Sequence, residues 1–249
     1  MPIYIKSKKE IEKIKEAGKI VAEVLTKIEG RIKPGVSLKE LEQFCETLIR
    51  KRGGLPAFKG YKGFPGAVCI SLNEEIVHGI PNGRRLKEGD IIKVDVGVIK
   101  DGYLADGAKT YTLGKVDSQV QKLIEVTALA LTLGIKKSRE GKRVGDISFA
   151  IQKKVEEAGF SVVRELTGHG VGIELHEEPV IPNFGKEGKG VLLKSGMTLA
   201  IEPMVNLGSP ETETLNNGWT IITKDRLPSC HFEHTVLVTE EEPEILTSG

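Results

Sequence analysis

Four stretches of the chain place apolar residues three or four positions apart, which is the spacing that buries one face of a helix. The first predicts a helix over residues 8–29, with an apolar face of Ile11, Ile14, Ala17, Val21, Val24 and Ile28. Another follows Ser37 and runs to Gly53-Gly54. Both begin at a Ser-x-x-Glu pattern, which is typical of a capping box. The two later helices are predicted over residues 120–133 and from Asp146, which we expect to cap it, to Gly159.

Short apolar runs between the helices predict β-strands. They cover residues 67–72, 162–166, 198–202 and 230–238. A further strand is expected to begin at Trp219, whereas the Gly-, Pro- and aromatic-rich residues 55–66 predict an irregular loop. Helices followed by strands thus occur twice along the chain. This order predicts an α+β protein of two similar halves, roughly 1–115 and 116–249, although no repeat is visible in the sequence.

The most informative pair of strands lies in residues 91–108, where two β-branched runs flank Asp101-Gly102. Asp-Gly favours a two-residue hairpin turn, and this turn would place Gly97 opposite Asp106. Asp95 would then share a face of the sheet with Asp106, with Cα atoms roughly 7–8 Å apart. Such a pair of acids can hold an ion between them, or each Asp can cap a turn or meet a Lys. The hairpin alone leaves both interpretations open.

Composition narrows the class of protein. The net charge of +1 argues against a dedicated nucleic-acid binder, which usually carries a marked basic excess. No signal peptide and no run of about 18 apolar residues is present, so we expect a cytoplasmic protein with no membrane partner. An odd number of cysteines without a C-x-x-C pair excludes a disulfide framework and suits a reducing compartment; they are Cys45, Cys69 and Cys230.

Residues 167–179 are rich in Gly, His and Glu, but they match no common catalytic motif. A dinucleotide-binding G-x-G-x-x-G would need glycine in place of Ile173. A zinc-binding H-E-x-x-H helix would need histidine in place of Val180, and Pro179 would break that helix. The nucleophile motif G-x-S-x-G is absent from the chain. Elsewhere, His78 ends an apolar run, where a single histidine is usually structural.

Four acids nevertheless lie in or beside strands that should be buried, and His169 lies in a predicted glycine-rich turn. Either glutamate alone is readily explained as a charge on an edge strand facing water. Several unpaired buried acids together would be strongly destabilising, and bound metal is the simplest solution. Four carboxylates and one imidazole suit two divalent cations, namely Mn²⁺, Fe²⁺, Co²⁺ or Zn²⁺. The predicted metal ligands are Asp95, Asp106, His169, Glu202 and Glu233.

The same residues carry a resemblance to a known family. The motifs I-V-H-G-I-P, K-V-D-V-G, A-D, T-G-H-G-V-G, L-H-E-E-P, I-E-P and F-E-H-T resemble, in order and spacing, the type I methionine aminopeptidases. The resemblance covers nearly the whole chain. It implies the pita-bread fold as a single catalytic domain over 1–249. It also implies metal-dependent removal of the initiator methionine from nascent proteins, with a small second residue preferred.

The resemblance also implies a role for each site residue. Asp106 and Glu233 would bridge two cations, Asp95 would chelate one of them, and His169 would serve the other. Glu202 would be both a ligand of that second cation and the group that moves protons. His78 and His176 would contact the substrate, and an apolar pocket would hold the methionine side chain. The implied pocket residues are Tyr61, Phe64, Cys69, Leu175 and Trp219.

Two pocket positions differ from the commonest pattern of the family, because Phe64 replaces a frequent Tyr and Leu175 replaces a frequent aromatic residue. Both remain apolar, so we expect methionine specificity to hold. The expected partners are nascent polypeptide N-termini, with no specific nucleic acid and with transient ribosome contact as an open question. Lys-rich segments such as Lys136-Lys137 are more simply explained as solvated charge. We expect a monomer.

Three alternatives remain open at this point. Cys69 could be a nucleophile, although its apolar strand offers no evident base. A proline-directed peptidase of the same architecture would have a similar site, but such enzymes carry a large N-terminal domain that this sequence does not show. A metal-free relative that only binds protein or RNA is the third alternative. Such modules lose metal ligands, whereas this chain retains all five.

Overall fold

The computed structural model describes residues 3–248, and its first helices begin where the capping boxes predict. Helix α1 spans Lys8–Ile28 and α2 spans Leu38–Lys51. Ser7 and Ser37 each accept the backbone N–H three residues ahead, and the glutamate there accepts the serine N–H in return. A 3₁₀ turn, η1 (Glu29–Arg31), ends α1. The predicted helices of the first half are therefore confirmed.

Helices α3 (Ser118–Ile135) and α4 (Val144–Glu157) belong to the second half. The cap predicted for α4 is wrong by three residues, because Arg143 holds the N-cap position and Asp146 lies inside the first turn. The Asp146 carboxylate still accepts the N–H of Arg143 at 2.7 Å, and it accepts that of Gly188 at the same distance. Asp146 thus closes the helix N-terminus from within.

The predicted hairpin lies at the centre of the molecule. Strands β4 (Ile91–Lys100) and β5 (Tyr103–Thr112) pair along their whole length. Asp101 and Gly102 form the turn with positive φ values of 50° and 81°. Gly97 pairs with Asp106, as the sequence predicts, so Asp95 and Asp106 are diagonal neighbours on one face.

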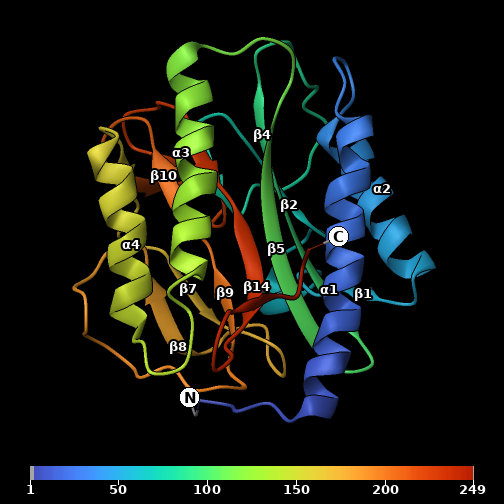
Figure 1. The fold of residues 1–249 in the computed structure, drawn as a ribbon. Helices are drawn as coiled ribbons and strands as arrows, with labels where there is room; N and C mark the ends of the chain where they lie inside the picture. Colours follow the sequence, from blue (N-terminus) through green and yellow to red (C-terminus); the bar gives the residue numbers. More distant parts are fainter. Residues whose placement is uncertain (1–2, 249) are drawn as a thin grey trace.

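Within residues 3–248, nine strands form one large sheet, in which every pairing is antiparallel. The main path runs β1-β4-β5-β14-β9-β7-β8, with β2 beside β4 and β15 beside β14. Figure 1 shows α1 and α2 over one half of this sheet and α3 and α4 over the other. Besides β4 and β5, the strands of this sheet are β1 (Leu55–Pro56), β2 (Cys69–Leu72), β7 (Thr167–Gly170), β8 (Glu177–Pro182), β9 (Thr198–Ile201), β14 (Glu233–Leu237) and β15 (Glu244–Ile245).

Smaller antiparallel sheets flank the large one. One has the order β13-β10-β6 and the other β11-β12-β3. Their strands are β3 (Glu75–Val77), β6 (Ser161–Val162), β10 (Met204–Asn206), β11 (Thr212–Thr214), β12 (Ile221–Thr223) and β13 (Ser229–His231).

Several predicted strand boundaries are wrong. The strand predicted over 162–166 is limited to β6, and Trp219 lies in the loop before β12 rather than at a strand start. Residues 230–238 are interrupted at Phe232, because β13 pairs with β10 whereas β14 joins the large sheet. Part of the predicted loop 55–66 pairs with β4 as β1, and another part forms the 3₁₀ turn η2 (Tyr61–Gly63).

The glycine-rich segment around His169 is strand β7 rather than a turn. Its glycines allow the backbones of neighbouring strands to approach closely. A Cβ at Gly168 would lie 2.4 Å from the carbonyl oxygen of Ala200, and one at Gly170 would lie 2.4 Å from that of Glu178. Glycine is therefore required here by packing between strands rather than by turn geometry.

Separate hydrophobic cores lie under the helix pairs. The first joins α1 and α2 to β4 and β5, and it includes Leu237 and Leu246 from the end of the chain. The second joins α3 and α4 to β9 and β14. No helix within residues 3–248 combines the length and the apolar content that a membrane crossing requires.

Candidate functional site

The predicted site residues meet at one cavity of about 310 Å³. All twelve of them line it, from both halves of the chain. Asp95 comes from β4, Asp106 from β5, Glu233 from the start of β14 and His169 from β7, while Glu202 directly follows β9. Because these strands are neighbours in the sheet, one face of it gathers the five predicted metal ligands.

Burial makes the charged state of this acid cluster unfavourable. It raises the pKa of Asp95, Glu202 and Glu233 well above the ordinary carboxyl range, and neighbouring carboxylates raise these pKa values further. Burial raises the pKa of Asp106 to about 7, although hydrogen bonds from Gly107 and Asp95 act in the opposite direction. Asp106 and Glu233 are only 4% and 2% exposed. The protein alone thus leaves the cluster electrostatically uncompensated.

Two carboxylate oxygens of the cluster lack a hydrogen-bond donor within residues 3–248. Asp95 Oδ1 and Glu233 Oε1 are buried without a hydrogen-bond partner in the described part of the chain. Ligand atoms of Asp106, His169 and Glu233 lie within 4.8 Å of one another. A divalent cation would occupy such a space and offset the repulsion between the acids. The residues present therefore fit a metal centre with oxygen and imidazole ligands.

His169 is oriented to offer a lone pair to this centre. Its Nδ1 lies 2.9 Å from the carbonyl oxygen of Gly170, so Nδ1 carries the proton and Nε2 is free. Nε2 faces Glu202 Oε1 at 3.4 Å. Burial lowers the pKa of His169 to about 4, which keeps the ring neutral. A metal-ligating histidine usually has this arrangement, with its other nitrogen bonded to a carbonyl.

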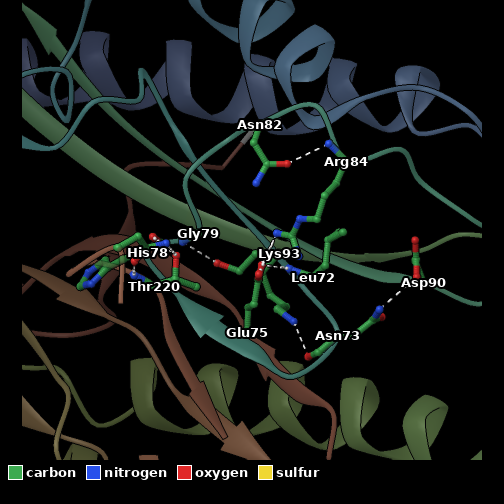
Figure 2. A network of polar contacts seen from close by, with 12 residues as sticks. Leu72, Asn73, Glu75, His78, Gly79, Asn82, Arg84, Asp90, Lys93 and Thr220 are labelled. Atoms are coloured by element: carbon green, nitrogen blue, oxygen red, sulfur yellow. Dashed lines mark hydrogen bonds and ion pairs between the residues drawn. The ribbon is translucent and has the colours of Figure 1, made fainter. Parts of the chain in front are cut away.

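His78 is held at the cavity by its backbone. It has a positive φ of 57°, which is uncommon for a residue with a side chain, and it precedes Gly79. A Cβ at Gly79 would lie 2.2 Å from the carbonyl oxygen of Ile70. The Gly79 N–H donates to Ser71 Oγ at 3.0 Å, and the Thr220 hydroxyl donates to the His78 carbonyl at 3.4 Å (Figure 2). Burial lowers the pKa of His78.

A polar network behind His78 anchors its strand. The Glu75 carboxylate accepts the Leu72 N–H at 2.8 Å and pairs with Arg84 at 2.7 Å, which closes the turn between β2 and β3 (Figure 2). The buried Lys93 ammonium on β4 donates to the carbonyl of Asn73 at 2.7 Å. Burial lowers the pKa of Lys93 to about 8. These contacts fix the turn on β4 and so fix the strand that leads to His78.

His176 lines the cavity beside His169, with ring centroids 4.4 Å apart. Its Nδ1 lies 2.8 Å from the Tyr61 hydroxyl, and its ring stacks on Tyr61 with centroids 5.3 Å apart. Its loop is anchored by the next residue, because the Glu177 carboxylate accepts the N–H groups of Ile173 and Glu174 and pairs with the buried Lys6. Burial lowers the pKa of His176 to about 3, so its ring is neutral at physiological pH.

The cavity also has an apolar wall. Phe64 and Trp219 pack edge to face with centroids 5.1 Å apart, and Leu175 lies with them in one buried cluster. Cys69 belongs to the same cluster. Burial raises the pKa of the Cys69 thiol well above its ordinary value, and the charges of Asp95 and Asp106 add to this effect. A thiolate nucleophile is therefore disfavoured at this position.

Sequence reasoning missed several residues at the site, among them Phe58 and His231. Phe58 lines the cavity and lies over Gly97, where a Cβ would come 2.6 Å from its ring. His231 faces Glu202 and Glu233 at 3.6 and 4.0 Å. The signal for His231 was available, because it lies two positions before Glu233 in an extended segment and should face the same side. Nothing in the sequence around Phe58 distinguishes it from other loop aromatic residues.

Known proteins resemble this chain in sequence and in fold. Residues 12–240 match the sequence pattern of metallopeptidase family M24. Methionine aminopeptidase 1 of Bacillus subtilis is 50% identical over 245 residues, which are 98% of this chain and 99% of that protein. A methionine aminopeptidase structure from Thermotoga maritima superposes with a TM-score of 0.98 at 47% identity and covers 100% of both chains.

A prolidase structure from Pyrococcus furiosus is also similar, with a TM-score of 0.81 and 25% identity over 98% of this chain and 65% of that one. The predicted pita-bread fold, the predicted metallopeptidase activity and the resemblance to methionine aminopeptidases are confirmed by these matches. Since the family pattern spans most of the sequence and the Bacillus relative matches over nearly its full length, this chain belongs to metallopeptidase family M24.

Proposed function

We propose that this protein is a two-metal aminopeptidase that removes the initiator methionine from nascent proteins with a small second residue. The observation that carries the proposal is that five residues able to ligate metal and a cluster of apolar residues line the same cavity. The relatives named methionine aminopeptidases support the choice of substrate. We further propose that residues 1–249 form a single catalytic domain that works as a monomer in the cytoplasm, on polypeptide N-termini.

The acid cluster and His169 would hold the proposed cations. Asp95, Asp106 and Glu233 would be ligands through their carboxylates, and His169 and Glu202 would complete the set of ligands. The chemistry supplied by such cations, when bound, is acidification of a water molecule and polarisation of the peptide carbonyl. Co²⁺, Mn²⁺, Fe²⁺ and Zn²⁺ all suit this mixed oxygen and nitrogen ligand set.

The chain's own residues position the substrate and move the proton. Glu202 takes the proton of the attacking water and passes it to the amide nitrogen of the leaving peptide. His78 and His176 donate hydrogen bonds to the peptide as charge develops on its oxygen. The flexible thioether of methionine fits among Phe64, Leu175 and Trp219 without a polar contact. Tyr61 holds His176 from behind, at 2.8 Å between its hydroxyl and Nδ1.

A peptide assay tests the proposal. Release of Met from Met-Ala-Ser is compared with hydrolysis of an Xaa-Pro peptide, using protein stripped with chelator and protein resupplied with Mn²⁺ or Co²⁺. We expect Met release that chelator abolishes and that either cation restores, and no cleavage of Xaa-Pro. Activity that survives exhaustive metal removal would contradict the two-metal mechanism. Cleavage of Xaa-Pro alone would favour a proline-directed peptidase of the prolidase type instead.

A further inference from the structure

The imidazole of His231 is buried beside the candidate metal ligands Glu202 and Glu233 and is not one of the five predicted ligands. Its side chain is 1% exposed, and neither ring nitrogen has a hydrogen-bond partner among residues 3–248. Its backbone is held on both sides by one side chain. The Thr110 hydroxyl accepts the His231 N–H at 3.2 Å and donates to its carbonyl at 2.6 Å. The ring therefore projects from a fixed point, and Nε2 is the atom that faces the acids.

The acids in front of His231 are two of the predicted ligands. Nε2 lies 3.6 Å from Glu202 Oε2 and 4.0 Å from Glu233 Oε2. Glu202 thus has a different histidine at each oxygen, because its Oε1 lies 3.4 Å from Nε2 of His169. The half-buried Glu202 carboxylate is flanked on both sides by imidazoles. Such a carboxylate can offer one oxygen to a cation and the other to a hydrogen-bond donor.

The two imidazoles differ in what lies behind them, and this difference separates their roles. Nδ1 of His169 has the Gly170 carbonyl as an acceptor, so its proton is placed there and Nε2 is free to ligate. Nδ1 of His231 has no acceptor in the described structure. A proton on that nitrogen would be a buried, unpaired donor, which is costly. The neutral tautomer of His231 with the proton on Nε2 avoids this cost.

We infer that His231 is a positioning residue, which directs Nε2–H at Glu202 Oε2, 3.6 Å away, and leaves Glu202 Oε1 to face His169 and a cation. Ligand atoms of His231, Glu202 and Glu233 lie within 4.8 Å of one another. The same tautomer argument disfavours His231 as a ligand, because ligation through Nε2 would leave Nδ1–H without an acceptor. By fixing one oxygen of Glu202, His231 limits the rotation of the group that we propose as both ligand and proton carrier. This inference rests on the proposed metal centre.

The first test reads the tautomer directly in the folded wild-type protein. Nitrogen-15 NMR of histidine-labelled protein, metal-free and with Zn²⁺, distinguishes a protonated ring nitrogen from an unprotonated one. We expect His231 to carry its proton on Nε2 in both states. A proton on Nδ1 would overturn the inference. This measurement needs neither catalysis nor a variant.

The second test measures metal binding in two variants. Gln retains an N–H donor of similar reach, whereas Leu fills the space without one. We expect His231→Leu to weaken Mn²⁺ binding at one site by about 10- to 100-fold, which is typical for loss of a partner that orients a ligand. His231→Gln should remain within a few-fold of wild type. The Co²⁺ absorption spectrum should change in the Leu variant and be kept in the Gln variant.

A matched control comes from the neighbouring histidine. His234 points elsewhere, with its Nδ1 2.8 Å from the Thr247 hydroxyl, so His234→Gln should leave Mn²⁺ affinity unchanged. Equal affinity in His231→Leu and wild type would overturn the role of His231 and leave the proposed function standing. A wild-type protein that binds no divalent cation would instead overturn the proposed function, whereas the tautomer measurement would still report on His231.

Discussion

Cys69 lies on β2 directly opposite Asp95 on β4, which places a thiol against the acid cluster. Because burial and the nearby carboxylates raise its pKa, the thiolate is scarce at neutral pH. We expect Cys69→Ala to keep kcat within about threefold of wild type and to change KM modestly, since the thiol lines the substrate cavity. Steady-state release of Met from Met-Ala-Ser measures both constants. Complete loss of turnover in a folded variant would favour a nucleophilic thiol.

His78 contributes a hydrogen bond to the peptide in the proposed mechanism. Removing one donor from such a site typically lowers kcat by about 10²- to 10³-fold, and we expect this from His78→Ala. Metal stoichiometry should remain as in wild type, because His78 is outside the ligand cluster. Steady-state kinetics and metal titration of the same preparation measure kcat and metal stoichiometry. Unchanged kcat with normal metal content would remove His78 from the mechanism.

Residues whose surroundings are local could be predicted from the sequence. The shared face of Asp95 and Asp106 follows from the Asp-Gly turn, because that turn fixes the register. Roles that depend on distant partners could not be predicted. The sequence indicates that His231 faces the same side as Glu233, but its approach to Glu202 arises only in the fold. Trp219 lines the cavity from a loop rather than from the strand that its neighbours predict.

The segment before α1 is fastened to the loop that carries His176. Lys6 pairs with Glu177, and both side chains are at most 1% exposed. Removing one partner of a buried ion pair leaves the other charge uncompensated, so we expect Lys6→Met to lower the free energy of unfolding by about 3–5 kcal/mol. Urea unfolding measures this change. Lys9→Met, at an exposed position on α1, is the control and should stay within about 0.5 kcal/mol of wild type.

Helices α1 and α2 are joined by an ion pair that depends on pH. Arg52 and then Lys27 lower the pKa of Glu23 from 4.5 to about 2. A depressed folded-state pKa means that this stabilisation is complete above pH 4.5 and is lost as the pH falls toward 2. We expect Glu23→Gln to cost about 0.2–1 kcal/mol at pH 6 and much less near pH 2.5. Urea unfolding at both values checks this, and an equal cost at both would contradict it.

Elements with strong local signals were predicted well. The capping boxes and the apolar faces fix α1 and α2, and the hairpin turn fixes β4 and β5. Short strands were predicted poorly, since their pairing partners decide where they end. The break at Phe232 arises because β13 and β14 belong to different sheets, which no local pattern indicates. For β7, the glycines suggested a turn, but close packing between strands is their actual role.

The whole molecule should be less stable without metal, because four acids from separate strands then lie together uncompensated. At a free cation concentration of 100 times Kd, binding to the folded state adds about 2.7 kcal/mol. For a protein of this size we expect Tm to rise by roughly 5–10 °C. Thermal unfolding with chelator and with added Mn²⁺ measures the shift. The double variant Asp95→Asn/Asp106→Asn should show no response to Mn²⁺, and an equal response would contradict the site.

Local sequence patterns do not predict how the two halves of the chain pair with each other. Helices followed by strands indicate the repetition, but not that β14 lies beside β5. That pairing brings Glu233 next to the acids of the first half. The resemblance to a known family implies the arrangement that the residues alone left open, and the roles that it implies for the site residues are predictions.

The junction between β5 and β14 has one further consequence. Glu233 pairs with Ala108 and His234 with Gly107, so the candidate ligands lie on both sides of the boundary where the halves adjoin. An ion bound there would touch both halves at once and act as a clasp between them. Binding of an ion would then stabilise the contact between the halves. By the same coupling free energy, a distant change that destabilises this contact would lower the affinity for the ion.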